Sequence, residues 1–408
     1  MSSLRSLTLF ALSALVLAPV AASAQQRDSG AVKAVTPQLD FSGLILGNYQ
    51  YKTDSASKAG LGGNSPNKFE IERVYLTFRM PVGERMSIRA TTDIFQQTNT
   101  ANNGFYAGWV VRLKYGYLQY NFANDIGDVK GFNALARIGM LHNVVIDHEE
   151  LFWPRYLSQA AVERNGFFSS ADLGLASLVT LPNKWGEVYA TITNGPGYTN
   201  QETDRFKDFA LRLTLTPLST AEAMGGYFKT FAITPWYYKG FTGSKYQAST
   251  FNTVTCVNCP INDGLQRDRF GIFTGIRDRR LTLGAEYAQR MEDLEGGANT
   301  VTSPRTVTQQ KGQLISAFAI ARPLEWMDAK EKSNFGLVGR IDQFTPNTNS
   351  TSTTTNTLSS YDRLLIAGVF WEPTPRTALT LDYQGRSPQS GSLNVEQTTW
   401  FLHWKAEF

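Results

Sequence analysis

Apolar and polar residues alternate along most of the chain with a period of two. The C-terminal segment shows this most clearly: Trp400, Leu402, Trp404, Ala406 and Phe408 form an apolar row, and His403, Lys405 and Glu407 form a polar one. A period of two is that of a β-strand. A strand with one apolar and one polar face fits a wall between lipid and water. The pattern therefore predicts membrane-spanning strands.

The alternation predicts about sixteen strands, an even number, as single-chain bacterial barrels have. They are expected at Asp40–Thr53, Lys68–Met80, Arg85–Gln97, Gly108–Phe122, Phe132–Leu141, Asp172–Leu181, Glu187–Asn194, Asp208–Thr216, Tyr227–Tyr238, Arg269–Arg277, Arg280–Met291, Lys311–Arg322, Lys332–Thr345, Tyr361–Glu372, Arg376–Ser387 and Glu396–Phe408. Short turns alternate with long polar connections. The fold class predicted for 40–408 is all-β: a transmembrane antiparallel β-barrel with short periplasmic turns and long external loops.

The N-terminus predicts export. Met1–Arg5 carries a positive charge, Ser6–Val20 is apolar, and Ala22-Ser23-Ala24 supplies small residues for cleavage. We expect 1–24 to be a signal peptide and 25–39 a short periplasmic leader. No other run approaches the length of about 18 apolar residues that a spanning helix needs. An exported chain of this kind enters a membrane by closing a barrel, which predicts the outer membrane of a Gram-negative bacterium.

Composition changes this picture little. Apolar residues make up 42% and aromatic residues 12%, as a barrel with one lipid-facing row per strand requires. The formal net charge of +4 indicates no nucleic-acid partner. Cys256 and Cys259 form one close pair without a second Cys or His pair, which favours a small loop disulfide over a metal site. We expect no cofactor, and outer-membrane lipid as a partner.

The direction of the side chains predicts a basic lumen. Placing Val111, Leu113, Tyr115 and Tyr117 toward lipid turns Arg112 and Lys114 toward channel water. The same argument turns Arg89, Arg137 and Arg212 inward. Rings of Arg or Lys favour anions. The alternative is that these arginines pair with acids only to brace the barrel interior.

Several short motifs between residues 133 and 217 occur in an order that resembles the phosphate-selective porin O and P family. They are Arg137-Ile138-Gly139-Met140, Glu163-Arg164, Asp172-Leu173-Gly174-Leu175, Thr193-Asn194-Gly195 and Lys207-Asp208-Phe209-Ala210 with Pro217. Phe69–Leu76 resembles the second strand of that family, and the terminal Phe408 resembles the assembly signal of outer-membrane barrels. The resemblance implies a sixteen-stranded, homotrimeric porin with an anion-selective channel. The chain lacks the proline common in relatives near Met140–Val145, and no phosphate site carries over residue by residue.

The connection His142–Ala171 differs from the other loops because it carries both charges and aromatic rings. In general porins the third external loop folds into the lumen and sets the constriction. We therefore expect a constriction loop at 142–171, with Asp147, Glu149, Arg155, Glu163 and Arg164 as its charged candidates. An ordinary packed surface loop is the alternative. Asp147, His148 and Glu149 match no standard metal-ligand spacing.

Three classes of function remain to be compared. An outer-membrane enzyme needs a nucleophile with a histidine partner, but the chain has three histidines and no Gly-x-Ser-x-Gly motif. A purely structural barrel would have fewer strands and a packed interior. We expect a channel for passive diffusion of small anionic solutes such as phosphate. The alternative is a general or sugar-specific diffusion channel, with Phe152, Trp153 and Tyr156 as a sliding surface for sugar rings.

Overall fold

The computed structural model describes residues 38–97, 108–123, 131–222, 226–243, 264–296, 306–327, 332–348, 362–388 and 395–408. The predicted signal peptide, nearly all of the predicted leader, and Cys256 with Cys259 lie outside the described residues. No helix among the described residues is long and apolar enough to cross a membrane.

Sixteen antiparallel strands form one closed barrel, which confirms the predicted fold class. The strands are β1 Asp40–Lys52, β2 Asn67–Pro81, β3 Met86–Gln97, β4 Gly108–Asn121, β5 Asn133–His142, β6 Ala171–Thr180, β7 Gly186–Thr193, β8 Asp208–Leu215, β9 Ala232–Thr242, β10 Leu265–Arg277, β11 Leu281–Gly296, β12 Thr306–Ala321, β13 Phe335–Thr345, β14 Asp362–Thr374, β15 Thr377–Pro388 and β16 Gln397–Glu407. Each pairs with its neighbour in sequence, and β1 closes the ring against β16.

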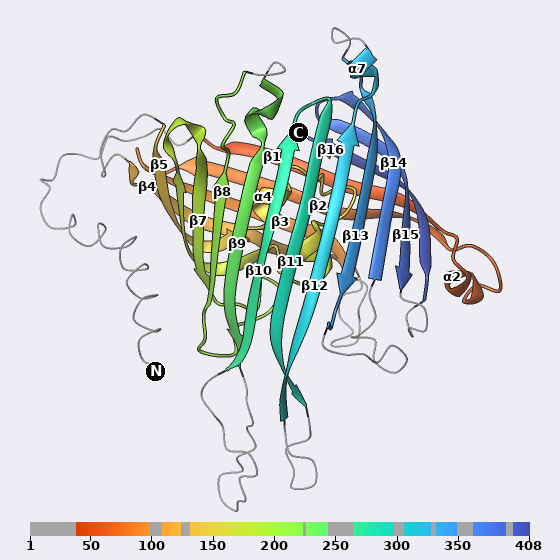
Figure 1. Ribbon diagram of the computed structural model, residues 1–408, viewed down its shortest axis with the longest axis horizontal. Coiled ribbons are helices and arrows are strands. Elements are labelled where there is room, and N and C mark those ends of the chain that lie inside the picture. Colours follow the sequence, from red (N-terminus) through yellow and green to blue (C-terminus); the bar gives the residue numbers. More distant parts are fainter. Residues whose placement is uncertain are drawn as a thin grey trace, which may run out of the picture.

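Short helical segments lie in the connections. They are the α-helices α2 Ser55–Ala59, α4 Ile146–Glu149, α5 Ala161–Arg164 and α7 Leu324–Met327, and the 3-10 helices η1 Pro182–Lys184 and η2 Tyr227–Thr230. The C-terminus and α7 lie at one end of the barrel (Figure 1). We call this the turn end, because it also carries the tight connections β10–β11 and β14–β15. We call the opposite end the loop end.

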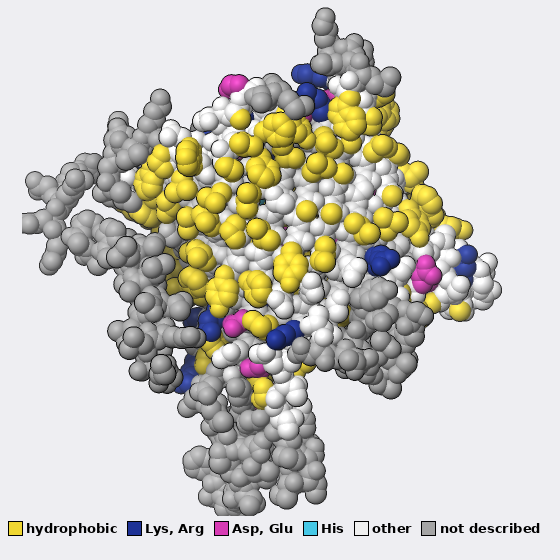
Figure 2. Space-filling view, in the orientation of Figure 1, with side chains coloured by type: hydrophobic (Ala, Val, Ile, Leu, Met, Phe, Trp, Pro, Cys, Tyr) yellow, Lys and Arg dark blue, Asp and Glu magenta, His cyan; other side chains and the backbone are white. Residues whose placement is uncertain are grey.

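The outer face of the wall is an apolar band. Along β14 buried and exposed residues alternate, and the exposed row includes Leu365 and Val369, which are 46% and 52% exposed. Figure 2 shows apolar side chains gathered over the wall, with Lys, Arg, Asp and Glu toward its upper and lower edges. This arrangement is what a strand barrel needs to face hydrocarbon at mid-height and water at both rims.

Strand boundaries differ from the predicted ones by up to five residues, with the largest differences at the start of β9, the end of β11 and the start of β12. Tyr227–Thr230, expected as strand, forms the 3-10 helix η2. Gly226 precedes it with φ of +80°, a left-handed conformation that glycine adopts without strain. The strand then begins at Ala232.

A β-bulge in β4 overturns one predicted side-chain row. Thr91 pairs with Tyr115 and Thr92 pairs with Leu113, so Lys114 is the extra residue between them. An extra residue shifts every later side chain to the opposite face. Tyr115 and Tyr117, predicted to face lipid, therefore point inward and are 7% and 8% exposed.

Candidate functional site

The connection between β5 and β6, residues 143–170, lies inside the barrel, and we call it the lumen loop. Its middle reaches strands far from its own ends. Arg340 Nη1 of β13 donates to the Gln159 carbonyl at 2.8 Å, and Gln384 Nε2 of β15 donates to the Leu157 carbonyl at 3.1 Å. The Tyr156 hydroxyl lies 2.9 Å from Thr380 Oγ1. Because β13 and β15 are not neighbours of β5 or β6, the loop crosses the lumen.

Other contacts hold the parts of the loop nearer its ends. Arg212 of β8 donates to the Val144 carbonyl, and His148 Nε2 lies 3.0 Å from Thr234 Oγ1 of β9. Arg290 of β11 donates to the Asn165 carbonyl at 3.4 Å. Backbone carbonyls anchored in this way fix the loop main chain and not only its side chains.

Aromatic side chains of the lumen loop fill the space between the loop and the wall. Phe152, Trp153 and Tyr156 are 7%, 1% and 7% exposed. Phe152 packs on Phe273 and Trp153 on Phe318, with ring centroids 5.1 and 5.2 Å apart. The predicted sliding surface for sugars is therefore wrong for these three residues, because packing on the wall hides their rings from the passage.

The charged candidates of the lumen loop take different positions. Arg155 forms a bidentate ion pair with Glu163, at 2.7 and 2.9 Å, and a second ion pair with Glu150. Arg164 is half-buried, and no partner of its guanidinium is found in the described part of the chain. Asp147 lies within electrostatic range of Arg212, Arg137 and Arg89, and burial raises the pKa of its carboxyl while these arginines oppose the rise.

Glu149 is the most deeply placed of these candidates, at 3% exposed. It adjoins Glu286 of β11, which is 5% exposed. Burial raises the pKa of the Glu149 carboxyl well above its usual range, and the charge of Glu286 adds to this. Glu149 thus belongs to the contact between loop and wall.

Strands β2–β5 form a basic wall. We use this name for the arc that carries Arg79, Arg89, Arg112, Lys114 and Arg137. Arg89 Nη1 lies 3.0 Å from His142 Nε2, and Arg89 Nε donates to Thr91 Oγ1. Arg137 donates to Gln119 Oε1 at 3.0 Å and to the Tyr189 hydroxyl at 3.2 Å. Arg89 and Arg137 thus point inward and have neutral partners.

Lys114 turns inward, as predicted. The prediction that it meets channel water is wrong. It is 3% exposed because it occupies the bulge, where Tyr75 covers it. Its Nζ lies 4.2 Å from the centre of the Tyr75 ring and donates to the Tyr75 hydroxyl at 3.2 Å. Within the described chain, neither Arg89 nor Arg137 nor Lys114 forms an ion pair.

Arg112 and Arg212 each form an ion pair with an acid instead. Arg112 Nη2 lies 2.8 Å from Asp93, which also pairs with Arg73, and the Arg112 guanidinium packs between the rings of Phe95 and Tyr198. Arg212 is 2% exposed and pairs with Glu187. These two arginines therefore fit the alternative expectation, in which arginines pair with acids to brace the barrel interior.

Sequence reasoning missed Tyr198. It lies in the loop-end connection between β7 and β8, where no strand period locates a side chain. Its hydroxyl accepts from Arg112 Nη2 at 2.9 Å and donates to Asp93 Oδ2 at 3.2 Å. The tyrosine thereby caps the Arg112–Asp93 pair from outside the strands.

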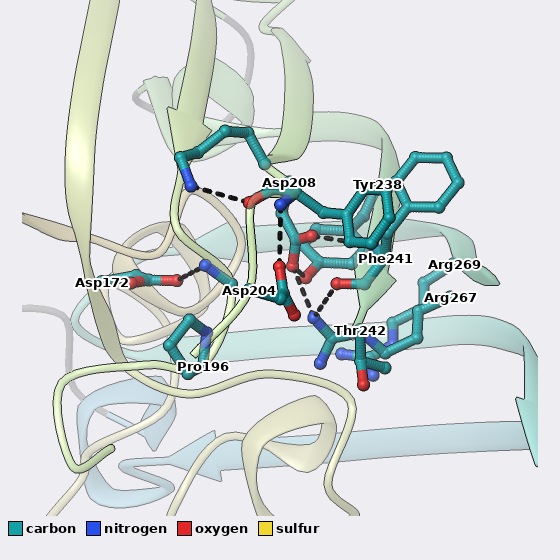
Figure 3. Close-up of polar contacts among 12 residues, drawn as sticks. Asp172, Pro196, Asp204, Asp208, Tyr238, Phe241, Thr242, Arg267 and Arg269 are labelled. Carbon is teal, nitrogen blue, oxygen red and sulfur yellow. Dashed lines mark hydrogen bonds and ion pairs between the residues drawn. The ribbon is translucent and has the colours of Figure 1, made fainter. Parts of the chain in front are cut away.

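A second polar network holds the connections at the loop end of β8, β9 and β10 (Figure 3). Asp208 accepts from the Tyr238 hydroxyl, from Arg267 Nη2 at 2.9 Å and from the Phe241 amide at 2.9 Å. Asp172 Oδ2 accepts from the Gly195 amide at 2.7 Å. The arginine of this network is paired with an acid, so the network holds loops in place and offers no free charge.

Two cavities adjoin the basic wall on either side of the lumen loop. The one toward the turn end, about 410 Å³, is lined by Arg79, Arg89 and Arg137 among others. The one toward the loop end, about 430 Å³, is lined by Arg73, Arg155 and Arg164 among others. Both cavities thus lie against β2 and β3, one toward each end of the barrel. No group of side chains among the described residues has the composition of a metal site.

Comparison with known proteins matches neither a family model nor a curated protein. Similar solved structures include outer-membrane channels and porins. The outer-membrane channel DcaP of Acinetobacter baumannii has a TM-score of 0.60 at 10% identity, covering 93% of this chain and 100% of that one. An anion-selective porin from Comamonas acidovorans has a TM-score of 0.55 at 11% identity, and the match covers 91% of this chain and 100% of that one. The trimer form of OmpT, an outer-membrane protein of Vibrio cholerae, has a TM-score of 0.53 at 9% identity, and the match covers 92% of this chain and 100% of that one. The chain therefore has the fold of outer-membrane porins.

Proposed function

We propose that the protein is an outer-membrane porin that passes small anionic solutes, such as phosphate, by passive diffusion. The observation that carries this proposal is the pair of inward cations on the basic wall, Arg89 and Arg137, that form no ion pair with an acid among the described residues. A cation that no carboxylate neutralises leaves a positive potential in the passage. A narrow wall of low dielectric focuses this field and concentrates anions.

The lumen loop supplies the constriction in this proposal. Asp147 and Glu150 lie on the loop, while Arg89 and Arg137 lie on the wall. A solute that crosses between them meets a transverse field, which orders its charge distribution. No catalytic step and no cofactor are required, because the driving force is the concentration gradient of the solute.

The setting of the channel belongs to the same proposal. The turn end faces the periplasm, the loop end faces the outside, and the apolar band contacts outer-membrane lipid. Residues 1–24 direct export as a signal peptide. A homotrimer is supported by the porin fold and by the trimer form of the similar OmpT structure. The resemblance to the phosphate-selective porin O and P family supports phosphate as the solute.

Reversal potentials in planar bilayers test the anion preference. The wild-type channel in a KCl gradient should favour chloride, and conductance in potassium phosphate should show passage of phosphate. The double variant R89Q/R137Q should lose most of this preference, because two charges in a confined wall change the local potential by several kT. Both side chains face the lumen and not lipid, so the barrel should still fold.

The matched control is R280Q, because Arg280 lies at the tip of the β10–β11 turn, paired with Asp278 and away from the passage. It should leave the reversal potential unchanged. A wild-type channel that favours potassium, or an R89Q/R137Q channel with the wild-type reversal potential, would refute the proposal.

A further inference from the structure

The cavity at the loop end of the basic wall has a composition unlike that of a phosphate site. Its two acidic lining residues are Glu70 and Glu72. Two of its three arginines already form ion pairs, Arg73 with Asp93, which Arg112 shares, and Arg155 with Glu150 and Glu163. An orthophosphate dianion would meet Glu72, Glu70 with its partner Lys68, and only one guanidinium without an ion pair. Electrostatics disfavours this small, highly charged ion.

Arg164 supplies the free guanidinium. It ends helix α5 on the lumen loop, and no ion pair or hydrogen bond of its side chain is found in the described residues. Burial lowers its pKa, and the charges of Asp342 and Asp362 oppose this shift without contacting the guanidinium. A partly buried cation without a partner is costly, so an anionic group from a solute would relieve the cost.

The rest of the lining suits a neutral, hydroxylated ring. Four glutamine side chains, Gln50, Gln96, Gln159 and Gln384, offer both donors and acceptors. Phe95 and Phe401 add two aromatic rings; the guanidiniums of Arg73 and Arg112 pack over Phe95, and His403 stacks on Phe401. Glu70 and Glu72 can accept hydrogen bonds from hydroxyl groups. The volume of about 430 Å³ lies within the usual range for small-molecule sites.

We propose that this cavity is an entry subsite for a ring-shaped, polyhydroxylated monocarboxylate, that is, a sugar acid of the uronate class. Arg164 binds the carboxylate, the glutamines and glutamates bind hydroxyl groups, and a phenylalanine packs on the ring. This inference rests on the proposed channel function and names a solute class for it. It places the subsite before the constriction, so the solute is aligned before it meets Arg89 and Arg137.

Block of single-channel current by added solutes tests the subsite. Glucuronate added from the loop-end side should block wild-type current at lower concentration than glucose, open-chain gluconate or orthophosphate. In R164Q the glucuronate block should weaken about ten-fold or more, as expected for loss of a charge-assisted hydrogen bond, while the glucose block stays the same. In F95L both ring solutes should block less well, because the aromatic face is lost.

The control R280Q should match wild type throughout. Equal block by glucuronate and glucose in wild type, stronger block by orthophosphate, or an R164Q channel with undiminished glucuronate block would each overturn the subsite. These outcomes are separate from the channel proposal, because anion preference in KCl depends on Arg89 and Arg137. A channel that keeps this preference but shows no glucuronate block would reject the subsite alone.

Discussion

The residue with the least expected position is Glu149, a charged loop side chain buried against another carboxyl. Two adjoining carboxyls cannot both ionise cheaply in a buried site. Neither oxygen of Glu286 nor Oε1 of Glu149 finds a hydrogen-bond partner in the described structure. The contact is therefore favourable only when a proton is present. This makes the seating of the lumen loop sensitive to pH.

Replacing Glu149 with glutamine should remove that sensitivity. The pKa of Glu149 is raised in the folded protein, so its stabilising contribution is fully present below the unfolded value of about 4.3 and is lost as pH rises through the folded value. Each unit of raised pKa corresponds to about 1.4 kcal/mol. Unfolding in detergent, followed by tryptophan fluorescence between pH 4 and 9, should show a decline for wild type and a flatter profile for E149Q.

The control for this measurement is E222Q, because Glu222 is exposed in a turn-end connection. It should keep the wild-type profile. An E149Q protein whose stability falls with pH as steeply as that of wild type would show that the Glu149–Glu286 contact carries no net pH dependence.

At the scale of elements, Arg340 of β13 is the charged strand residue that holds the middle of the lumen loop. Arg340 is 3% exposed, forms a bidentate ion pair with Asp342 at 2.8 and 2.7 Å, and donates to the Gln159 carbonyl. R340Q should break this pair and cost roughly 3–5 kcal/mol, since Asp342 is left buried without its cation. The lumen loop should then become accessible to trypsin at Arg155 or Arg164 in the folded barrel.

A similar pair at the rim provides the control. Arg386 pairs with Asp362, but its side chain is 45% exposed, and such pairs contribute little. R386Q should leave the tryptic pattern of the lumen loop unchanged. If R340Q also leaves it unchanged, the loop is held by its aromatic packing and not by this arginine.

The elements also show how far the sequence could predict the structure. Strand positions followed from alternation because each strand keeps one face toward lipid over its whole length. The bulge at Lys114 escaped prediction, because an extra residue leaves the local composition unchanged while it reverses the later rows of β4. The placement of Arg164 beside Phe95 and Gln384 depends on how the lumen loop crosses the barrel, and contacts between distant strands decide that path.

At the scale of the whole molecule, the barrel separates two environments by side-chain direction alone. Arg340 and Asp342 are 3% and 1% exposed inside, and Ile341 between them is 48% exposed outside. The strands nearest Ile341 continue the apolar face with Ala317 and Leu365. A shift by one residue would place an ion pair against lipid, so the alternation fixes the register of the wall.

Replacing one apolar residue of the outer face with a charged residue should therefore destabilise the barrel in a membrane. I341R places a cation in the middle of the apolar band, and the expected cost is roughly 2–4 kcal/mol near the bilayer midplane. V395R is the matched control, because Val395 is 53% exposed just before β16 at the loop end, where a charge reaches water. Refolding into lipid vesicles in a urea series, with the folded fraction read from gel mobility before heating, should show a lower urea midpoint for I341R and an unchanged one for V395R. In detergent micelles, where the apolar layer is thinner and more easily penetrated by water, the difference should shrink. Equal midpoints for I341R and V395R in vesicles would mean that this face of the wall does not meet hydrocarbon, and the orientation of the barrel in the membrane would have to be revised.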